Sequence, residues 1–317
     1  MIRHDAAPSI GTPHGAPNIG PQSTKGRSMG ELRYEFPDTL DAAVALLAGE
    51  SGAARVIAGG TDVLVQLRGD TIEPGLMVGI NNIPEVRTIA AENGGFRFGA
   101  AVTGMELLEH GAFAKTWPGV IDAVNLIGSI QIRSRATVGG NFCNASPSAD
   151  SVPAMFAANA VATIVGSKGR REILVEDIAT GPGQTSLAKD EILTSFFLPE
   201  RPPHAGDAYL RFTPRTEMDI AVVGVSVSLA LDGGGSCTAA RVALAAVAER
   251  VLLVDEAANA LIGTPVDDTA LEALAVAVRA ACRPIDDKRG TKTYRIKVTG
   301  VLARRAARIA LARARER

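Results

Sequence analysis

Cysteine and histidine are scarce in this chain, and the few present are widely spaced. Its 317 residues include three cysteines, Cys143, Cys237 and Cys282, with no CxxC pair among them, and four scattered histidines. This spacing indicates neither a disulfide framework nor a metal site. The four thiolates of an iron–sulfur cluster cannot come from this chain alone. Such cysteine usage is typical of a reducing cytoplasm, where we expect the protein to reside.

Long apolar runs and an excess of one charge are also missing. The 33 basic and 34 acidic residues leave a formal net charge of −1 at pH 7, which gives no field to attract nucleic acid or anionic lipid. Apolar runs such as 220–227 and 242–248 fall far short of the roughly 20 residues that a membrane span requires. With 46% apolar residues, the chain predicts a soluble globular protein of two or three domains.

The first 29 residues differ from the rest in composition. They are rich in Pro, Gly, Ser and Ala and show no periodic apolar pattern, which predicts a disordered extension over residues 1–29 or translation from Met29 instead. The segment lacks the apolar core of a secretory signal, so we expect no cleaved export peptide. Order is expected to begin near Leu32.

Beyond this segment, the apolar periodicity predicts an α+β fold. Helices are expected at residues 39–48, 63–67, 118–127 and 153–158, and strands at 55–58, 77–80, 96–100, 161–165, 173–175 and 191–198. Residues 103–106 form a capping box that opens one more helix. After a break at residues 181–184, strands at 208–212, 221–231 and 237–247 precede helices at 251–261, 269–281 and 292–315. Residues 233–235 (GGG) are expected to connect the last two strands as a hairpin.

Two glycine-rich segments, predicted to be turns, carry most of the chemical information. They are residues 58–62 (AGGTD), which follow an apolar run, and residues 137–141 (TVGGN). Paired glycines let a backbone fold tightly with N–H groups bare enough to approach a diphosphate. Either turn alone is usually structural, whereas two together predict a dinucleotide held from both sides. No GxGxxG motif occurs, so a Rossmann-type NAD site is not predicted.

Polar side chains around these segments leave two interpretations open. Thr61 or Asp62 is suited to cap the short helix expected from residue 63. Asn144, Ser146 and Asp150 follow the second segment and could bond diphosphate, ribityl or isoalloxazine atoms. For Asp150, capping the helix near Pro153 is an equally good interpretation.

In these motifs the chain resembles the FAD-binding medium subunit, or domain, of the molybdenum hydroxylases, the family of xanthine dehydrogenase and aerobic carbon monoxide dehydrogenase. The resemblance runs from about Tyr34 to the C-terminus and includes residues 144–147 (NASP), 218–221 (MDIA) and 284–290 (PIDDKRG). It implies a two-part FAD-binding region of vanillyl-alcohol oxidase or PCMH type over residues 30–204, with subdomains at about 30–87 and 88–204. A C-terminal domain, residues 205–317, would hold a three-stranded antiparallel sheet with helices.

The same resemblance implies which residues would bind FAD. The first segment would wrap the diphosphate with Val56, Ile57, Ala58, Gly59, Gly60, Thr61, Asp62 and Val63, and the second would bond it with Thr137, Val138, Gly139, Gly140 and Asn141. Asp150 would bind farther along the cofactor. Ile127 and Leu193 would pack against FAD, unless they are ordinary core residues. Arg211 stands where the family usually has a flavin-contacting lysine. Ile220 would cover one isoalloxazine face, where some carbon monoxide dehydrogenases have a tyrosine, which weighs against carbon monoxide as the substrate.

By resemblance, the chain is a flavoprotein subunit that passes electrons from iron–sulfur clusters through FAD to an external acceptor. The implied partners are a small subunit with two-iron two-sulfur clusters and a large molybdopterin-binding subunit, in a dimer of heterotrimers. The lack of a cysteine-rich insertion argues against the 4-hydroxybenzoyl-CoA reductase variant. A free-standing FAD-dependent oxidoreductase and a flavin-free assembly scaffold stay open as alternatives. No catalytic acid or base is implied, and neither the substrate nor the acceptor is encoded here.

The last predicted helix carries a series of arginines interleaved with Ala, Leu and Ile: Arg304, Arg305, Arg308, Arg313, Arg315 and Arg317. This pattern is typical of a solvated amphipathic face. The sharper alternative is a docking surface for an acidic partner subunit.

Overall fold

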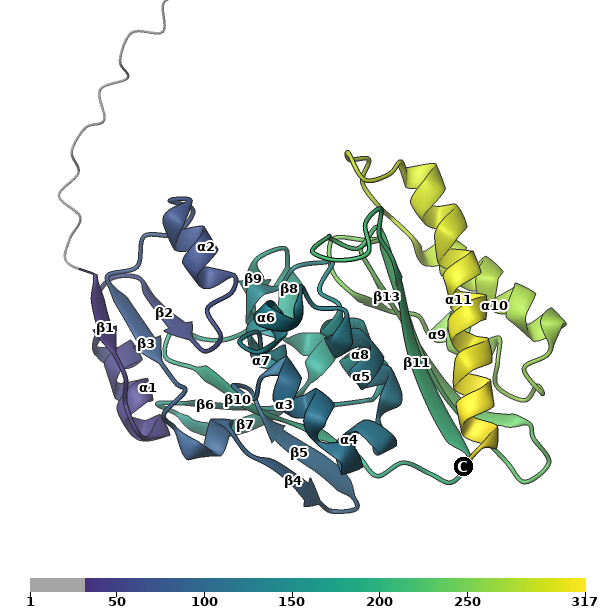
Figure 1. Ribbon diagram of the computed structural model, residues 1–317, viewed down its shortest axis with the longest axis horizontal. Coiled ribbons are helices and arrows are strands. Elements are labelled where there is room, and N and C mark those ends of the chain that lie inside the picture. Colours follow the sequence, from purple (N-terminus) through teal and green to yellow (C-terminus); the bar gives the residue numbers. More distant parts are fainter. Residues whose placement is uncertain (1–31) are drawn as a thin grey trace, which may run out of the picture. The chain divides into compact units, whose positions relative to one another are not determined.

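The computed structural model describes residues 32–317 (Figure 1). The extension predicted for residues 1–29 therefore lies outside the described residues. Within residues 32–317 the chain forms three main sheets, each with its own helices, in the order of the sequence.

The first sheet is parallel and has the strand order β1 (Arg33–Glu35), β3 (Leu76–Gly79) and β2 (Ala54–Ile57). Helix α1 (Leu40–Gly49) makes the crossover that parallel strands require. It is capped by the Thr39 hydroxyl, and it buries Leu40, Ala43, Val44 and Leu47 at helical spacing. Helix α2 (Val63–Arg68) follows β2, and a 3₁₀ turn, η1 (Pro84–Val86), follows β3. The first glycine-rich segment is therefore the connection from β2 to α2.

The second sheet is antiparallel, with the order β4 (Ile89–Glu92), β5 (Gly95–Gly99), β10 (Ile192–Leu198), β6 (Val161–Gly166) and β7 (Gly169–Leu174). Between β5 and β6 lie the helices α3 (Gly104–Glu109), α4 (Gly111–Thr116), α5 (Pro118–Asn125), α6 (Ile130–Arg133), α7 (Val138–Asn144) and α8 (Ser151–Ala157). The Phe196 ring joins sheet and helices, with centroids 5.4 Å from Phe98 and 5.1 Å from Phe142. This aromatic core fixes α7, and so the second glycine-rich segment, against the sheet.

A short connection between β7 and β10 completes this part of the chain. It consists of a 3₁₀ turn, η2 (Val175–Asp177), and a small hairpin of β8 (Ala179–Gly181) and β9 (Gln184–Thr185). Gly183, with φ of 69°, lies between the two hairpin strands.

The third sheet is antiparallel and consists of β11 (Ala205–Phe212), β12 (Val223–Leu231), β13 (Cys237–Ala245) and β14 (Leu252–Leu253). Helices α9 (Asp255–Asn259), α10 (Asp268–Ala281) and α11 (Lys292–Arg315) follow. Helix α11 packs along β11 and β12, whereas α5 contacts β11 and α8 contacts β12 and β13 (Figure 1). The sheet therefore joins the preceding region to the C-terminal helices.

Most predicted elements are confirmed to within a few residues. The capping box of Thr103 and Glu106 is present, the bounds of α11 match the prediction, and residues 233–235 connect β12 to β13. Short elements escaped the sequence analysis because two to four residues show no periodicity: β1, β4, β8, β9 and α6.

Three predictions about strands and helices are wrong. The C-terminal sheet has four strands instead of three, because the apolar start of the predicted helix 251–261 pairs with β13 as β14. Helix α9 covers only Asp255–Asn259 of that range. The strand expected at 173–175 runs instead from Gly169 to Leu174, since Val175 begins a 3₁₀ turn.

Candidate functional site

The two glycine-rich segments lie against each other in the folded chain. A Cβ placed on Gly59 would lie 1.9 Å from the carbonyl oxygen of Arg135, just before the second segment. A second contact joins the helices of the two segments: Gln66 Nε2 of α2 donates to Asn144 Oδ1 of α7 at 2.8 Å. The helices that follow the two segments are thus joined as well.

The second segment is a helix start, and the prediction of a turn there is wrong. Thr137 is the N-cap of α7, and its hydroxyl oxygen accepts from the Gly140 amide at 2.9 Å. The first segment does turn, because Gly60 has φ of 77°. Asp62 occupies the N-cap position of α2, but its side chain makes no capping hydrogen bond. Capping by Asp62 is therefore also wrong.

The glycines of these segments are required for different reasons. Gly59 is needed because the Arg135 backbone is too close for a side chain. Gly139 is needed because its Cβ would lie 2.4 Å from the carbonyl oxygen of Ala100. Gly140 is different, since it is exposed, its φ is ordinary, and a Cβ would meet only the Thr137 hydroxyl at 3.1 Å. Glycine at 140 therefore fits a group that approaches the backbone from outside the chain.

Three polar side chains of α7 and the loop after it, Asn141, Asn144 and Ser146, have partners within the protein. Asn141 Oδ1 accepts from the Ser151 hydroxyl at 2.8 Å, and the Ser146 hydroxyl accepts from the Ser148 amide at 3.3 Å. With Asn144 bonded to Gln66, these groups hold the local backbone in place. The donors best suited to an anion here are backbone N–H groups at the start of α7, where the helix dipole also favours negative charge.

Asp150 makes a buried three-residue cluster with strand β11. Its Oδ1 accepts from the Tyr209 hydroxyl at 2.7 Å, and its Oδ2 lies 2.6 Å from Arg211 Nη1. The Asp150 side chain makes no capping bond to α8, so the interpretation of Asp150 as a helix cap is wrong. Burial raises the pKa of Asp150 to about 6, although the charge of Arg211 and the two hydrogen bonds oppose that rise.

The three predicted apolar contacts differ in exposure. Leu193, on β10, is 3% exposed and packs in the same core as Phe98 and Phe196. Ile127 is half-buried after α5, where its carbonyl oxygen accepts from Arg133 Nη1 at 3.2 Å. Ile220 is 50% exposed in the loop between β11 and β12. Of the three, Ile220 is therefore the one most open to a ligand.

The remaining predicted residues belong to the same two connections. Val56 and Ile57 end β2, Ala58 and Thr61 lie in the turn, and Val63 begins α2. The Ala58 carbonyl oxygen accepts from Asn81 Nδ2 at 2.8 Å, which ties the turn to the end of the parallel sheet. Val138 is buried at the start of α7.

Two motifs that support the family resemblance meet near the start of α11. Arg289 Nε lies 3.8 Å from Asp219 Oδ1, so residues 284–290 contact residues 218–221. Asp287 Oδ1 accepts from Arg295 Nη2 at 2.7 Å, and Arg295 is itself 3% exposed. These ion pairs attach the loop between β11 and β12, which contains Ile220, to the buried Arg295 of α11.

Three residues that organise this region were not selected from the sequence: Gln66, Arg133 and Tyr209. Tyr209 could have been found from the sequence, because it lies two residues before Arg211 on a predicted strand. The two side chains therefore point to the same face of the sheet. No sequence pattern indicates Gln66 or Arg133. Gln66 bonds to Asn144, which is distant in the sequence, and Arg133 bonds to backbone carbonyl groups of residues 127–128, which show no side-chain pattern.

Residues 32–317 contain neither a cluster of metal-ligating side chains nor a helix suited to span a membrane. No group of three or more His, Cys, Asp or Glu side chains is placed to hold a metal ion in this range. The three cysteines are free. No helix of the described chain has the length and apolar character of a membrane span.

Comparison with known proteins gives matches over both parts of the chain. A family model described as the FAD binding domain in molybdopterin dehydrogenase matches residues 28–201, and one described as the CO dehydrogenase flavoprotein C-terminal domain matches residues 208–310. The xanthine dehydrogenase FAD-binding subunit of Escherichia coli O157:H7 is 33% identical over 283 residues, which are 89% of this chain and 96% of that protein.

Two further matches involve carbon monoxide dehydrogenases. The medium chain from Afipia carboxidovorans is 32% identical over 286 residues, 90% of this chain and 99% of that protein. The solved structure of the enzyme from Hydrogenophaga pseudoflava matches with a TM-score of 0.86 at 30% identity, covering 89% of this chain and 98% of that chain. The chain therefore belongs to the family of FAD-binding subunits of the molybdopterin dehydrogenases, which are oxidoreductases, and its cofactor is FAD.

Proposed function

We propose that this chain is the flavoprotein subunit of a heterotrimeric molybdenum hydroxylase. In this role it passes electrons from the iron–sulfur clusters of a small partner subunit through FAD to an external acceptor. A large molybdopterin-binding subunit would complete the trimer, and two trimers would form the cytoplasmic enzyme. The names of its relatives, a FAD-binding subunit and a medium chain, support a multi-subunit assembly.

One observation carries the assignment of the site: the two glycine-rich segments are packed together, with an exposed glycine at position 140. Close contact between Gly59 and Arg135 fixes the β2–α2 turn beside the start of α7. The β2–α2 turn and the exposed Gly140 of α7 therefore belong to segments that lie side by side. This arrangement suits a diphosphate bound from both sides.

In this proposal the chain holds and orients the cofactor, and FAD supplies the electron-transfer chemistry when bound. Residues 56–63 wrap the diphosphate, and residues 137–141 bond it from α7. Arg211 contacts the flavin end, held in place by Asp150. Ile220 covers the isoalloxazine ring, and Ile127 packs against the cofactor, whereas Leu193 supports the site from the core.

We also propose the division into an FAD-binding region of vanillyl-alcohol oxidase or PCMH type, residues 30–204 with parts at about 30–87 and 88–204, and a C-terminal domain, residues 205–317. The separate parallel and antiparallel sheets before residue 204 support the two parts. A buried cluster formed by residues 208–314 supports the C-terminal domain.

A pair of glycine variants tests the site. Gly140→Val places a branched side chain over the exposed backbone of α7, so we expect the purified protein to lose most of its FAD while it keeps a wild-type circular dichroism spectrum. Gly233→Val is the matched control, because nothing lies within 4 Å of a Cβ at that hairpin position. Wild-type flavin content in folded Gly140→Val protein would show that FAD does not approach the backbone there.

A further inference from the structure

Tyr209 is a buried tyrosine whose hydroxyl group bonds to Asp150. The residue is 1% exposed, and its ring belongs to the core that packs α7 and α8 against the antiparallel sheet. Its hydroxyl group donates to Asp150 Oδ1 at 2.7 Å, and the other oxygen of Asp150 accepts from Arg211 Nη1 at 2.6 Å. Tyr209 and Arg211 lie two positions apart on β11 and so share one face of the strand. Asp150 therefore links the two side chains.

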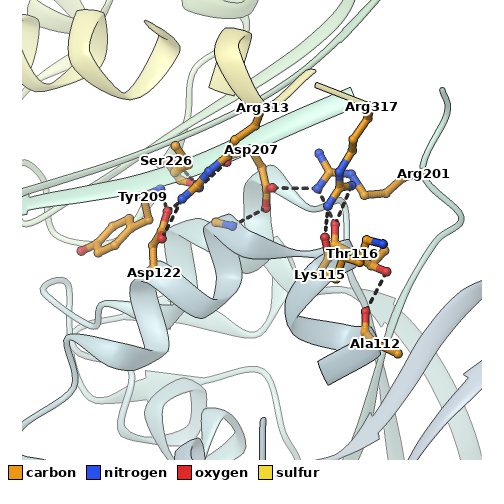
Figure 2. Close-up of polar contacts among 12 residues, drawn as sticks. Ala112, Lys115, Thr116, Asp122, Arg201, Asp207, Tyr209, Ser226, Arg313 and Arg317 are labelled. Atoms are coloured by element: carbon orange, nitrogen blue, oxygen red, sulfur yellow. Dashed lines mark hydrogen bonds and ion pairs between the residues drawn. The ribbon is translucent and has the colours of Figure 1, made fainter. Parts of the chain in front are cut away.

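The backbone of Tyr209 is held as well. Its amide donates to Asp122 Oδ2 of α5 at 3.3 Å, and the same oxygen lies 2.6 Å from Arg313 Nη1 of α11 (Figure 2). The Tyr209 ring points away from Arg313 in this view. Both ends of the residue are therefore fixed, the amide by Asp122 and the hydroxyl group by Asp150.

Strand β12 leaves space for the hydroxyl group. Gly224 lies opposite Arg211 in the register of β11 and β12. A Cβ at position 224 would lie 2.5 Å from the Tyr209 hydroxyl oxygen and 3.2 Å from the ring carbon that carries it. The closest contact is thus with the oxygen, so a side chain at position 224 would displace the hydroxyl group from Asp150. Glycine at this position therefore fits a tyrosine at 209 better than it fits a phenylalanine.

Arg211 keeps hydrogen-bonding capacity for a ligand. Its side chain is 5% exposed, and Nη1 donates to Asp150. Within residues 32–317, Nε and Nη2 of Arg211 have no partner, and neither is among the fully buried polar atoms that lack one. These two nitrogen atoms therefore stay within reach of a group outside the chain.

Asp150 controls how much charge Arg211 presents. Within residues 32–317, the charged and titratable groups that act on the Asp150 carboxyl group are Arg211 and Tyr209. Burial raises the pKa of Asp150 to about 6, whereas the Arg211 charge and the Tyr209 hydrogen bond favour the ionised form. Near neutral pH the carboxylate balances the Arg211 guanidinium group. At lower pH Asp150 is protonated, and the positive charge of Arg211 is left without this balance.

We propose that Tyr209 is a positioning residue for the flavin: its hydroxyl group holds Asp150, and Asp150 in turn orients Arg211 and balances its charge. This inference rests on the proposed function, in which Arg211 contacts the flavin end of FAD. A positive charge beside the flavin ring stabilises the electrons that the ring accepts. Protonation of Asp150 therefore raises the reduction potential of bound FAD, and the Tyr209 hydroxyl group sets the pH at which this happens.

The test measures the reduction potential of the full FAD-loaded chain between pH 5 and pH 8, by titration against redox dyes. We expect the wild-type plot of potential against pH to bend near pH 6. Tyr209→Phe keeps the ring but removes a hydrogen bond that favours ionised Asp150, so the bend should move up by about one pH unit. Between about pH 6 and about pH 7 the variant should therefore have the higher potential. The two plots should meet near pH 5, where Asp150 is protonated in both proteins.

Two further variants separate positioning from a merely structural role. Ser226 lies opposite Tyr209 on β12, is 1% exposed, and donates to the Ala208 carbonyl oxygen at 3.3 Å. Ser226→Ala therefore removes a buried hydroxyl group of the same sheet without touching Asp150, and its plot should match that of the wild type. Asp150→Asn has no carboxyl group to titrate and should show no bend near pH 6.

The flavin content of each protein distinguishes this inference from the proposed function. A wild-type chain that binds no FAD would contradict the proposed function and this inference with it. If the chains bind FAD, the inference alone is overturned when the Tyr209→Phe plot coincides with the wild-type plot, or when Ser226→Ala moves the bend equally. Loss of FAD from folded Tyr209→Phe protein would also overturn it, since the hydroxyl group would then serve binding itself. If Tyr209→Phe does not fold, a bend that persists in Asp150→Asn overturns the inference and its absence supports it.

Discussion

Asp150 shows how burial changes the chemistry of one carboxyl group in this protein. Tyr209 and Arg211 bond both of its oxygens, yet desolvation outweighs them and raises its pKa to about 6. The folded chain therefore binds a proton at Asp150 more tightly than the unfolded chain does, whose carboxyl keeps the ordinary pKa near 3.9. The contribution of this group to stability is largest at low pH and is lost as the pH rises from about 4 to about 6.

The Asp150→Asn variant tests this sign. Between pH 4.5 and pH 7 the free energy of unfolding of the wild type should fall by about 2 kcal/mol more than that of the variant. Urea unfolding of both proteins at the two pH values measures the difference. Parallel pH dependences in the two proteins would mean that the pKa of Asp150 is not raised.

At the residue scale, the sequence indicated which positions of the site matter, but often not why those residues are required there. Gly59, Gly139 and Gly140 were singled out as glycines that expose the backbone, but the first two are explained by close packing against Arg135 and Ala100. Those contacts join segments distant in the sequence, which local patterns cannot reveal. Asp150 was an equal choice between cap and ligand, and its actual partners lie on a strand some sixty positions away.

At the scale of elements, strand β11 and helix α11 approach each other unusually closely. A Cβ on Gly206 would lie 2.0 Å from the carbonyl oxygen of Ala310, and α11 presents the buried Ala303, Ala306 and Ala310 to the sheet. Small residues on both elements allow the contact. The spacing of the alanines in α11 was visible in the sequence. That they pack against β11 was not.

The Gly206→Val variant should separate these two elements. We expect it to lower the free energy of unfolding by about 1–3 kcal/mol or more, because the helix backbone leaves no room for a side chain. Ala312→Val, at an exposed position of α11, is the control and should change stability little. Equal stabilities of the two variants, measured by urea unfolding, would contradict the close packing of β11 on α11.

The arginines of α11 divide into structural and exposed groups. Arg304 pairs with Glu272 at 2.7 Å, Arg308 with Asp268 at 2.8 Å, and Arg313 with Asp122 at 2.6 Å. The predicted solvated face therefore describes Arg305, Arg308 and Arg315, which are exposed, although Arg308 also pairs with the exposed Asp268. Docking of a partner subunit on this helix stays a prediction, and these three exposed arginines are the residues with which to test it.

Arg313 connects α11 to α5, and its removal should lower the stability of the folded chain. Arg313→Ala leaves Asp122 without its bidentate partner and removes a bond to the Asp207 carbonyl oxygen. We expect a loss of about 1–3 kcal/mol in the free energy of unfolding. Arg305→Ala should cost less than about 0.5 kcal/mol. The prediction fails if thermal and urea unfolding rank the two variants alike.

At the scale of the molecule, the order of elements and the family could be predicted from the sequence, whereas the pairing of distant strands could not. Periodicity identifies β11, β12 and β13, but β14 is two residues long and is recognised as a strand through its pairing with β13. Likewise, the two glycine-rich segments indicated a dinucleotide site, but only folding brings α2 and α7 together through Gln66 and Asn144. Tertiary contacts decide such features.

The central claim, that the joined glycine-rich segments make this chain a carrier of FAD, is tested most directly by its flavin content. The chain is purified in the presence of FAD, its visible absorption spectrum is recorded, and the flavin released on denaturation is identified and quantified. We predict a flavin spectrum and one FAD per chain. Purified, folded protein without FAD, alone and after assembly with its partner subunits, would contradict the account.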